Sequence, residues 1–135
     1  MIRYIEPIAV DSYWPIVADT IGRALDEELT TEDVYEKLKM KTMALITVSL
    51  RGEIVAACVC EQVNYPRIRA LRVVALGGHR MKEWLSELSD FLDDWARDSD
   101  CDRIEQMGRK GWKRKLTEYD YKPRYVFMTK DLNNG

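Results

Sequence analysis

Residues 67–95 read RIRALRVVALGGHRMKEWLSELSDFLDDW, and this stretch decides the fold because its periodicity changes halfway along. The first half, up to Leu76, is apolar and rich in β-branched residues, which predicts a buried strand. A pair of glycines follows and allows a sharp backbone turn. From Met81 to Trp95 the large apolar residues recur at helical spacing. The stretch therefore predicts a strand, a glycine turn and an amphipathic helix in succession.

The turn between that strand and that helix is a candidate anion site. Residues 77–80 read GGHR, and a helix that begins just after them presents unpaired N–H groups and a positive dipole end. Arg80 would add charge that suits a phosphate. The alternative is a tight turn that leaves His79 and Arg80 in solvent. His79 is the only histidine, and a surface position is the alternative to a general-base role.

Composition limits the class of protein. The 135 residues fit one domain, which we expect to span residues 1–132 with a disordered tail at 133–135. Charged residues make up 33% of the chain and the net charge is −2, which argues against a protein that binds nucleic acid over its whole surface. The three cysteines and the lack of a signal peptide fit a reducing compartment. No spacing of ligands predicts a metal site, and no apolar run is long enough to span a membrane.

The rest of the chain surrounds the opening stretch with alternating elements. Thr30 with Asp33 resembles a capping box at the start of a helix, and an Arg-Gly pair at 51–52 predicts a hairpin. Strands are expected at 2–9, 42–50, 53–63, 67–76, 102–107 and 124–129, and helices from about 12 to 25, 31 to 40, 81 to 95 and 109 to 119, with a polar linker at 98–100. This order, β-α-α-β-β-β-α-β-α-β, predicts an α/β fold with a mixed β-sheet flanked by helices on both faces.

This order resembles the GNAT family of N-acetyltransferases across almost the whole chain. The resemblance implies that the loop after the fourth strand holds the pyrophosphate of acetyl-CoA, and that the fourth and fifth strands splay to admit the pantetheine arm. The loop residues are Leu76, Gly77, Gly78, His79, Arg80 and Met81. The family pattern Gln/Arg-x-x-Gly-x-Gly/Ala is not matched in either register of the glycines.

Further details are similar to a group of GNAT-like proteins encoded by tailed bacteriophages and prophages. They include Leu76-Gly77-Gly78, Trp95-Ala96 and the run from Gly108 to Trp112. Some GNAT-like phage proteins serve in the virion. The resemblance therefore implies the cytoplasm of a bacterial host, or the virion, as the location of the protein.

Two carboxylates and one tyrosine are the candidate catalytic residues. Glu61 lies at the end of the central strand expected at 53–63 and Glu105 lies on the strand expected at 102–107, and either could take a proton from an amine. Ordinary strand residues that face solvent are the alternative for both. The family tyrosine that donates a proton to the departing thiolate has its place at Leu116, so Tyr119 or Tyr121 could substitute only if the helix is displaced.

A basic cluster follows the fifth strand. Arg109, Lys110, Lys113 and Arg114 lie within six positions and are candidates to bind an acidic partner protein. The alternative is a solvated face balanced by the acids of the preceding helix. Nucleic acid is a less favoured partner, because no aromatic ladder accompanies the charges.

Two functions follow from these features. The unmatched loop and the missing tyrosine favour a non-enzymatic phage domain that serves in the virion or binds other proteins. The alternative is an acyl-CoA-dependent N-acetyltransferase that acts on an amine, for which acetyl-CoA would be the cofactor.

Overall fold

The computed structural model describes residues 1–108 and 110–133. A five-stranded sheet forms its centre, in the order β1-β2-β3-β4-β5. The strands are β1 (Ile2–Ile5), β2 (Ala44–Leu50), β3 (Glu53–Asn64), β4 (Arg69–Gly78) and β5 (Arg103–Gln106). Neighbouring strands are antiparallel except β4 and β5, which are parallel.

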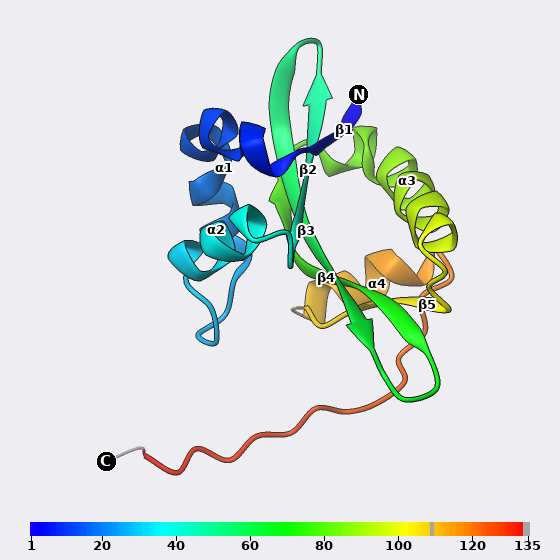
Figure 1. Cartoon of the computed structure of the whole chain (residues 1–135). Coiled ribbons are helices and arrows are strands. Elements are labelled where there is room, and N and C mark those ends of the chain that lie inside the picture. The colour runs from blue at the N-terminus through cyan, green and yellow to red at the C-terminus, as the bar shows by residue number, and fades with distance from the viewer. Residues whose placement is uncertain (109, 134–135) are drawn as a thin grey trace.

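Helices cover both faces of this sheet (Figure 1). The 3₁₀ turn η1 (Pro7–Ala9), α1 (Val10–Ala24) and α2 (Thr31–Lys39) lie on one side. The turn η2 (Met81–Glu83) and α3 (Leu85–Asp98) lie on the other and connect β4 to β5. A final helix, α4 (Lys110–Thr117), follows β5. The prediction of a mixed sheet flanked by helices on both faces is therefore confirmed.

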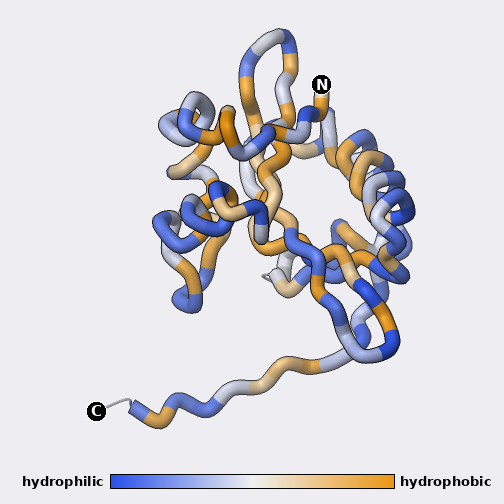
Figure 2. Tube along the Cα trace, viewed as in Figure 1, coloured by the Kyte–Doolittle hydropathy of each residue, from blue (hydrophilic) through white to orange (hydrophobic). Residues whose placement is uncertain are grey.

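Two apolar cores separate on the two faces of the sheet. One packs α1 and α2 against residues such as Leu45 and Val59, and the other packs α3 against residues such as Ile46 and Leu71. Figure 2 shows apolar residues recurring among hydrophilic ones along these helices and strands. β3 contributes to both cores, because Cys58 and Cys60 belong to the core beneath α3 and Val59 belongs to the core beneath α1 and α2. All three side chains are fully buried. The two thiols therefore serve as small buried apolar groups, as their place in a central strand predicts.

Local sequence signals explain several boundaries. Thr30 and Asp33 form the expected capping box, with the Asp33 N–H donating to Thr30 Oγ1 at 3.2 Å and the Thr30 N–H donating to Asp33 Oδ2 at 3.0 Å. Arg51 and Gly52 form the hairpin turn with φ of 53° and 81°. The glycine is suited to this turn because positive φ costs it little.

Three expectations about boundaries need correction. The first strand ends at Ile5 rather than Ala9, because Pro7 starts a 3₁₀ turn. Pro15 lies inside α1 rather than in its first turn, since the helix already begins at Val10. The final strand expected at 124–129 is wrong: within the described residues the order ends at α4, and residues 121–133 form no helix or strand. The disorder expected at 133–135 stays a prediction, because residues 134–135 lie outside the described part.

Candidate functional site

A cleft opens where β4 and β5 part. The two strands pair over only four residues, from Ala70 opposite Arg103 to Val73 opposite Gln106. Beyond Val73 the edge of β4 borders a cleft of about 360 Å³. The cleft is lined by Thr20 and Ala24 of α1, by residues 74–79, and by Gln106 and Trp112. The predicted splay of the fourth and fifth strands is thus present.

The backbone of β4 offers hydrogen-bonding groups to this cleft. The His79 N–H donates to the Val55 carbonyl at 3.0 Å, so this pair faces β3. Bonded and non-bonded positions alternate along an antiparallel pair. The N–H and C=O groups of Leu76 and Gly78 therefore point away from β3, toward the open side of β4.

The loop predicted to hold phosphates is only partly directed at the cleft. Leu76, Gly77, Gly78 and His79 line it, whereas Arg80 and Met81 do not. The Arg80 guanidinium is paired with Glu83, with its Nε 2.7 Å from Oε2. Arg80 would have to leave this ion pair to contact a phosphate.

Close contacts with neighbouring segments explain why positions 77 and 78 of the loop are glycines. The sequence alone does not reveal these contacts. Gly78 has φ of 147°, and a Cβ added there would lie 2.3 Å from the Val55 carbonyl oxygen. A Cβ on Gly77 would lie 3.3 Å from the Thr20 carbonyl oxygen of α1. The loop is further tied by Trp84, whose indole N–H donates to the His79 carbonyl at 2.8 Å. These contacts make the turn a packing feature as well as a candidate ligand site.

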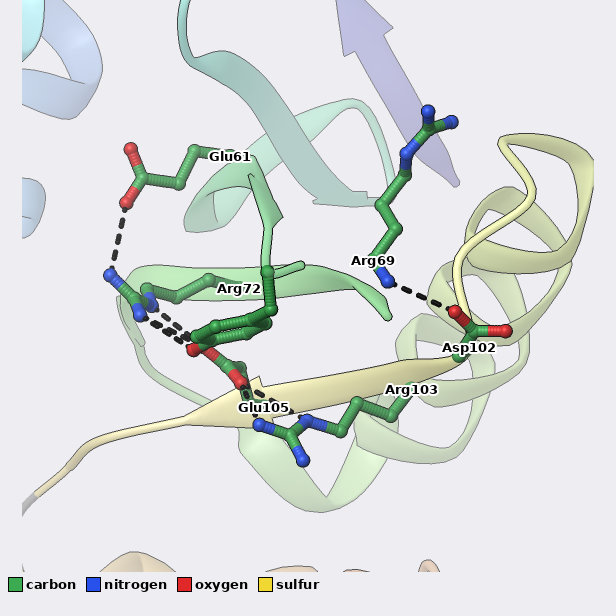
Figure 3. Close-up of polar contacts among 7 residues, drawn as sticks. Glu61, Arg69, Arg72, Asp102, Arg103 and Glu105 are labelled. Atoms are coloured by element: carbon green, nitrogen blue, oxygen red, sulfur yellow. Dashed lines mark hydrogen bonds and ion pairs between the residues drawn. The ribbon is translucent and has the colours of Figure 1, made fainter. Parts of the chain in front are cut away.

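Next to the cleft, a polar cluster joins three strands (Figure 3). We call Glu61, Tyr65, Arg72, Arg103 and Glu105 the Arg72 cluster. Arg72 Nη2 lies 2.9 Å from Glu105 Oε1, and its Nη1 lies 3.5 Å from Glu61 Oε1. The structure therefore brings the two candidate catalytic carboxylates onto one guanidinium.

Glu105 is the more fully bonded of these two carboxylates. Its Oε1 accepts from the Tyr65 hydroxyl at 2.8 Å, and its Oε2 accepts from Arg103 Nη2 at 3.0 Å. Partial burial raises the pKa of Glu105, but the hydrogen bonds from Tyr65, Arg72 and Arg103 outweigh it and leave the pKa lowered. Glu105 is thus a weak base that organises the cluster. Glu61 has one oxygen toward Arg72 and the other turned away from it (Figure 3).

Replacing Glu105 with glutamine should weaken the acid dependence of stability. Because the pKa of Glu105 is lowered from its usual 4.5, its contribution is present above about pH 4.5 and is lost as the pH falls below that value. We expect the free energies of unfolding of wild type and Glu105→Gln to differ by a constant amount near neutral pH and to converge at lower pH. Urea unfolding at several pH values measures this difference.

The Arg72→Met background is the control for that experiment. With the main charged partner gone, Glu105→Gln should change the free energy of unfolding less than it does in the wild type. An equal change in both backgrounds would contradict a role of Glu105 in this ion pair.

Arg69 and Asp102 stabilise the start of the β4–β5 ladder through two hydrogen bonds. The Arg69 N–H donates to Asp102 Oδ2 at 2.9 Å, and the Asp102 N–H donates to the Arg69 carbonyl at 2.7 Å (Figure 3). The Arg69 side chain also donates to the Ser99 carbonyl at 3.0 Å. Arginines on a central strand are thus explained by their bonds to neighbouring segments.

The candidate tyrosines lie outside the cleft. Tyr119 packs against the α3 core, and the cleft lining includes neither Tyr119 nor Tyr121. Burial, followed by the negative charge of Asp93, raises the pKa of Tyr121 well above its usual value. Trp112 lines the cleft instead, and a Cβ on Gly108 would lie 3.1 Å from its ring. Catalysis by Tyr119 stays a prediction that this placement does not favour.

The basic cluster is described only in part. Arg109 lies outside the described residues, as does the side chain of Lys110. Lys113 and Arg114 are exposed. In the described part of the chain no ion pair joins α4 to the acids of α3, so contact between the two helices does not neutralise these charges. Their role in binding a partner stays a prediction.

Two negative observations concern the described residues alone. No group of three or more of their histidine, cysteine or acidic side chains could hold a metal ion. None of their helices combines the length and the apolar character that a membrane-spanning segment requires.

Comparison with known proteins identifies the architecture. No protein-family model matches the chain, and no curated protein matches its sequence. Among solved structures, a ribosomal-protein-alanine N-acetyltransferase from Brucella melitensis biovar Abortus 2308 matches with a TM-score of 0.68 at 18% identity, over 96% of this chain and 99% of that chain. The glucosamine-6-phosphate N-acetyltransferase of Arabidopsis thaliana matches with a TM-score of 0.71 at 14% identity, over 98% of each chain.

A third match is a solved structure with acetyl-CoA. It is a predicted acetyltransferase with acetyl-CoA from Clostridium acetobutylicum, with a TM-score of 0.68 at 10% identity, over 97% of this chain and 95% of that chain. At such identities the similarity establishes the fold alone. The chain therefore has the GNAT acetyltransferase fold, as the order of its elements predicts.

Proposed function

We propose that the chain is an acyl-CoA-dependent N-acetyltransferase that acts on an amine. The observation that carries this proposal is the open edge of β4, where the backbone groups of Leu76 and Gly78 face a cleft of about 360 Å³. Ligand pockets commonly begin at about 300 Å³, so this volume suits part of a cofactor, with the remainder in solvent.

The residues of the cleft fit the acyl-pantetheine end of acetyl-CoA. A free strand edge can bond the amides of an extended ligand much as it would bond another strand. Gly77 and Ala24 lie at the cleft and leave room for such an arm. The phosphates would lie toward the loop at His79, where Arg80 is held by Glu83. When bound, acetyl-CoA would supply the acetyl group as a thioester.

Groups near the cleft perform the other steps of the reaction, which are the removal of a proton from the amine and the stabilisation of the acyl oxygen. Glu61 accepts the proton that the amine loses when its nitrogen replaces the thioester sulfur. The N–H groups of Leu76 and Gly78 hold the acyl oxygen as its negative charge develops. No described tyrosine lines the cleft, and the proton that the leaving thiolate takes up comes from water that enters the open cleft.

The alternative role, as a non-enzymatic part of a phage virion, stays a prediction. It rests on the unmatched loop pattern and on Leu116 in the place of the family tyrosine. The open cleft beside a polar cluster supports the transferase instead, because a domain that only docks onto other proteins does not need an empty strand edge there.

Blocking the cleft should abolish binding of acetyl-CoA. Thr20 lines the cleft from α1, so Thr20→Trp places a large ring in it. We expect calorimetric titration to give a micromolar-range Kd for the wild type, and a Kd at least about 30-fold higher for Thr20→Trp, equivalent to about 2 kcal/mol.

The control for this variant is Ile16→Trp. Ile16 lies one turn earlier on α1, is 57% exposed, and is not part of the cleft lining. This variant should bind as the wild type does. If the wild type shows neither heat nor a thermal shift with millimolar acetyl-CoA, the proposed function is wrong.

Removing the candidate base should slow turnover without weakening cofactor binding. Glu61→Gln keeps the shape of the side chain but cannot take a proton, and general-base catalysis contributes about 10²–10⁴-fold in rate. We expect kcat with an amine substrate to fall at least about 100-fold, while the Kd for acetyl-CoA stays the same. An unchanged kcat would exclude Glu61 as the base. The assay follows the release of CoA thiol across a panel of amines.

A further inference from the structure

The Arg72 cluster lies at the inner end of the cleft. Arg72 and Glu105 are opposite each other in the β4–β5 ladder, one position before the pairing stops. Leu71 and Val73, on either side of Arg72, belong to the core beneath α3, so by alternation the Arg72 side chain points to the other face of the sheet. Helix α1 lies on that face and forms one wall of the cleft. The cluster and this wall of the cleft are therefore on the same face of the sheet.

The guanidinium of Arg72 is held on one side by other members of the cluster. Its Nε lies 3.0 Å from Glu105 Oε1, and its Nη2 lies 3.2 Å from the Tyr65 hydroxyl oxygen. Glu105 is fixed in turn by Arg103, whose Nη2 donates to Oε2 at 3.0 Å. The Arg103 guanidinium lies 5.3 Å from the centre of the Tyr65 ring. These contacts set the direction of the Arg72 guanidinium without any contribution from Glu61.

The other side of the guanidinium, at Nη1, keeps an unused donor. Nη1 carries two N–H groups. Its contact within the described residues is with Glu61 Oε1 at 3.5 Å, which is longer than a usual N–H···O hydrogen bond. At least one of the two N–H groups therefore has no acceptor in the described part of the chain. The Arg72 side chain is 28% exposed, so a ligand can reach this group.

Glu61 places an unused acceptor beside this donor. The register of β3 and β4 sets Glu61 opposite Arg72. One carboxylate oxygen faces Arg72, and the other is turned away from the guanidinium (Figure 3). No described residue donates a hydrogen bond to that second oxygen. A carboxylate oxygen and a guanidinium N–H are thus adjacent, and both are open to a ligand.

We propose that this pair recognises an α-amine, which is an amine whose neighbouring carbon bears a carbonyl or carboxylate oxygen, as in an amino acid or at the N-terminus of a peptide. Glu61 receives the amine nitrogen, and the unused N–H of Arg72 donates to the oxygen. The inference rests on the proposed function and adds Arg72 as the residue that determines which amine is accepted.

The geometry fits this class of amine better than a simple alkylamine. The nitrogen and the oxygen of an α-amino acid unit are carried by adjacent carbon atoms, so they can contact two adjacent protein groups at once. A guanidinium is a strong donor to carbonyl and carboxylate oxygens. An alkylamine or a lysine side chain has no oxygen in that place. A site that hydrogen-bonds a substrate group discriminates against analogues that lack the group.

Turnover of two amines of similar shape tests the proposal in the wild type. L-Alaninamide and (S)-sec-butylamine differ in that an ethyl group replaces the carboxamide. With concentrations expressed as free amine, kcat/KM should be at least about 10-fold higher for L-alaninamide, as expected when a hydrogen bond to a charged group is gained. Its nitrogen is the less basic one, so intrinsic reactivity does not create this preference. Equal values, or a preference for sec-butylamine, would overturn the proposal.

Arg72→Met tests whether the guanidinium causes the preference. The ratio of the two kcat/KM values should fall at least about 10-fold in this variant, because methionine fills the space and donates no hydrogen bond. Arg97→Met is the matched control, since Arg97 lies on α3 with its side chain 75% exposed, and it should keep the wild-type ratio. Circular dichroism verifies that both variants are folded. A folded Arg72→Met variant with the wild-type ratio would show that Arg72 does not select the substrate.

Two more substrates identify the source of the α-amine. Faster turnover of L-alanine would indicate an amino acid with a free carboxylate, and faster turnover of L-alanylglycinamide would indicate the N-terminus of a peptide. If both react more slowly than sec-butylamine, recognition of α-amines is wrong.

Failure of this inference differs from failure of the proposed function. A wild type that neither binds acetyl-CoA nor releases CoA thiol with any amine would end both. A wild type that binds acetyl-CoA and acetylates amines without preferring α-amines would end this inference alone.

Discussion

Replacing Gly78 with alanine is expected to lower the free energy of unfolding by about 2–5 kcal/mol. A positive φ costs an L-residue about 1–2 kcal/mol, and forcing extra volume into a packed site costs about 1–3 kcal/mol. Both apply here, because φ is 147° and the new Cβ would lie 2.3 Å from the Val55 carbonyl oxygen. That oxygen belongs to backbone and already accepts from the His79 N–H, so it cannot move aside without breaking a bond of the sheet.

Gly52 provides the matched control. It also has positive φ, 81°, but nothing lies within 4 Å of a Cβ added there. Gly52→Ala should therefore cost only the conformational part, about 1–2 kcal/mol. Chemical unfolding of both variants measures the difference, which is the cost of the close approach between β3 and the loop. Equal losses would show that no such contact constrains Gly78.

Replacing Trp84 with alanine is expected to cost about 3–5 kcal/mol, the range for removing a large aromatic from a core. Trp84 is 1% exposed and packs in the core beneath α3. Its indole N–H also holds the His79 carbonyl at 2.8 Å, so the same side chain supports the helix and the loop. The variant should lose acetyl-CoA affinity as well as stability, because His79 lines the cleft.

Trp84→Phe separates these two roles. Phenylalanine retains much of the packing and lacks the N–H, so we expect a loss of about 1–3 kcal/mol. If the loop depends on the hydrogen bond, this variant should still show weaker binding of acetyl-CoA while it remains folded at 25 °C. Wild-type affinity in Trp84→Phe would mean that packing alone positions the loop.

The sequence predicts the fold well because its signals are local. The change of period after Gly78, the capping box at Thr30 and the turn at Gly52 each depend on a few adjacent residues, and each is confirmed. The predicted loop also reaches the cleft through residues 76–79. Strand residues followed by helix residues leave few topologies open, so these signals suffice to predict the order of the elements as far as α4.

The parts that the sequence misses depend on contacts between distant segments. Glu61, Arg72 and Glu105 lie on three strands, and only the register of the sheet places them on one guanidinium. Arg80 looks like a phosphate ligand until its pairing with Glu83 is known. Residues 124–129 have the composition of a strand, but a strand forms only where a neighbouring edge is within reach.

The short ladder between β4 and β5 has a consequence for how such a cleft can be gained or lost. The cleft exists because pairing stops at Val73 and Gln106, not because any side chain was removed to make room. Met107 and Gly108 line the cleft, just beyond the last pair. If the pairing of β4 with β5 continued for two more residues, the backbone of β5 would occupy the place proposed for the pantetheine arm. In this fold, the difference between an open cleft and a sealed sheet can thus lie in the backbone conformation of two residues, with every polar side chain of the Arg72 cluster left in place.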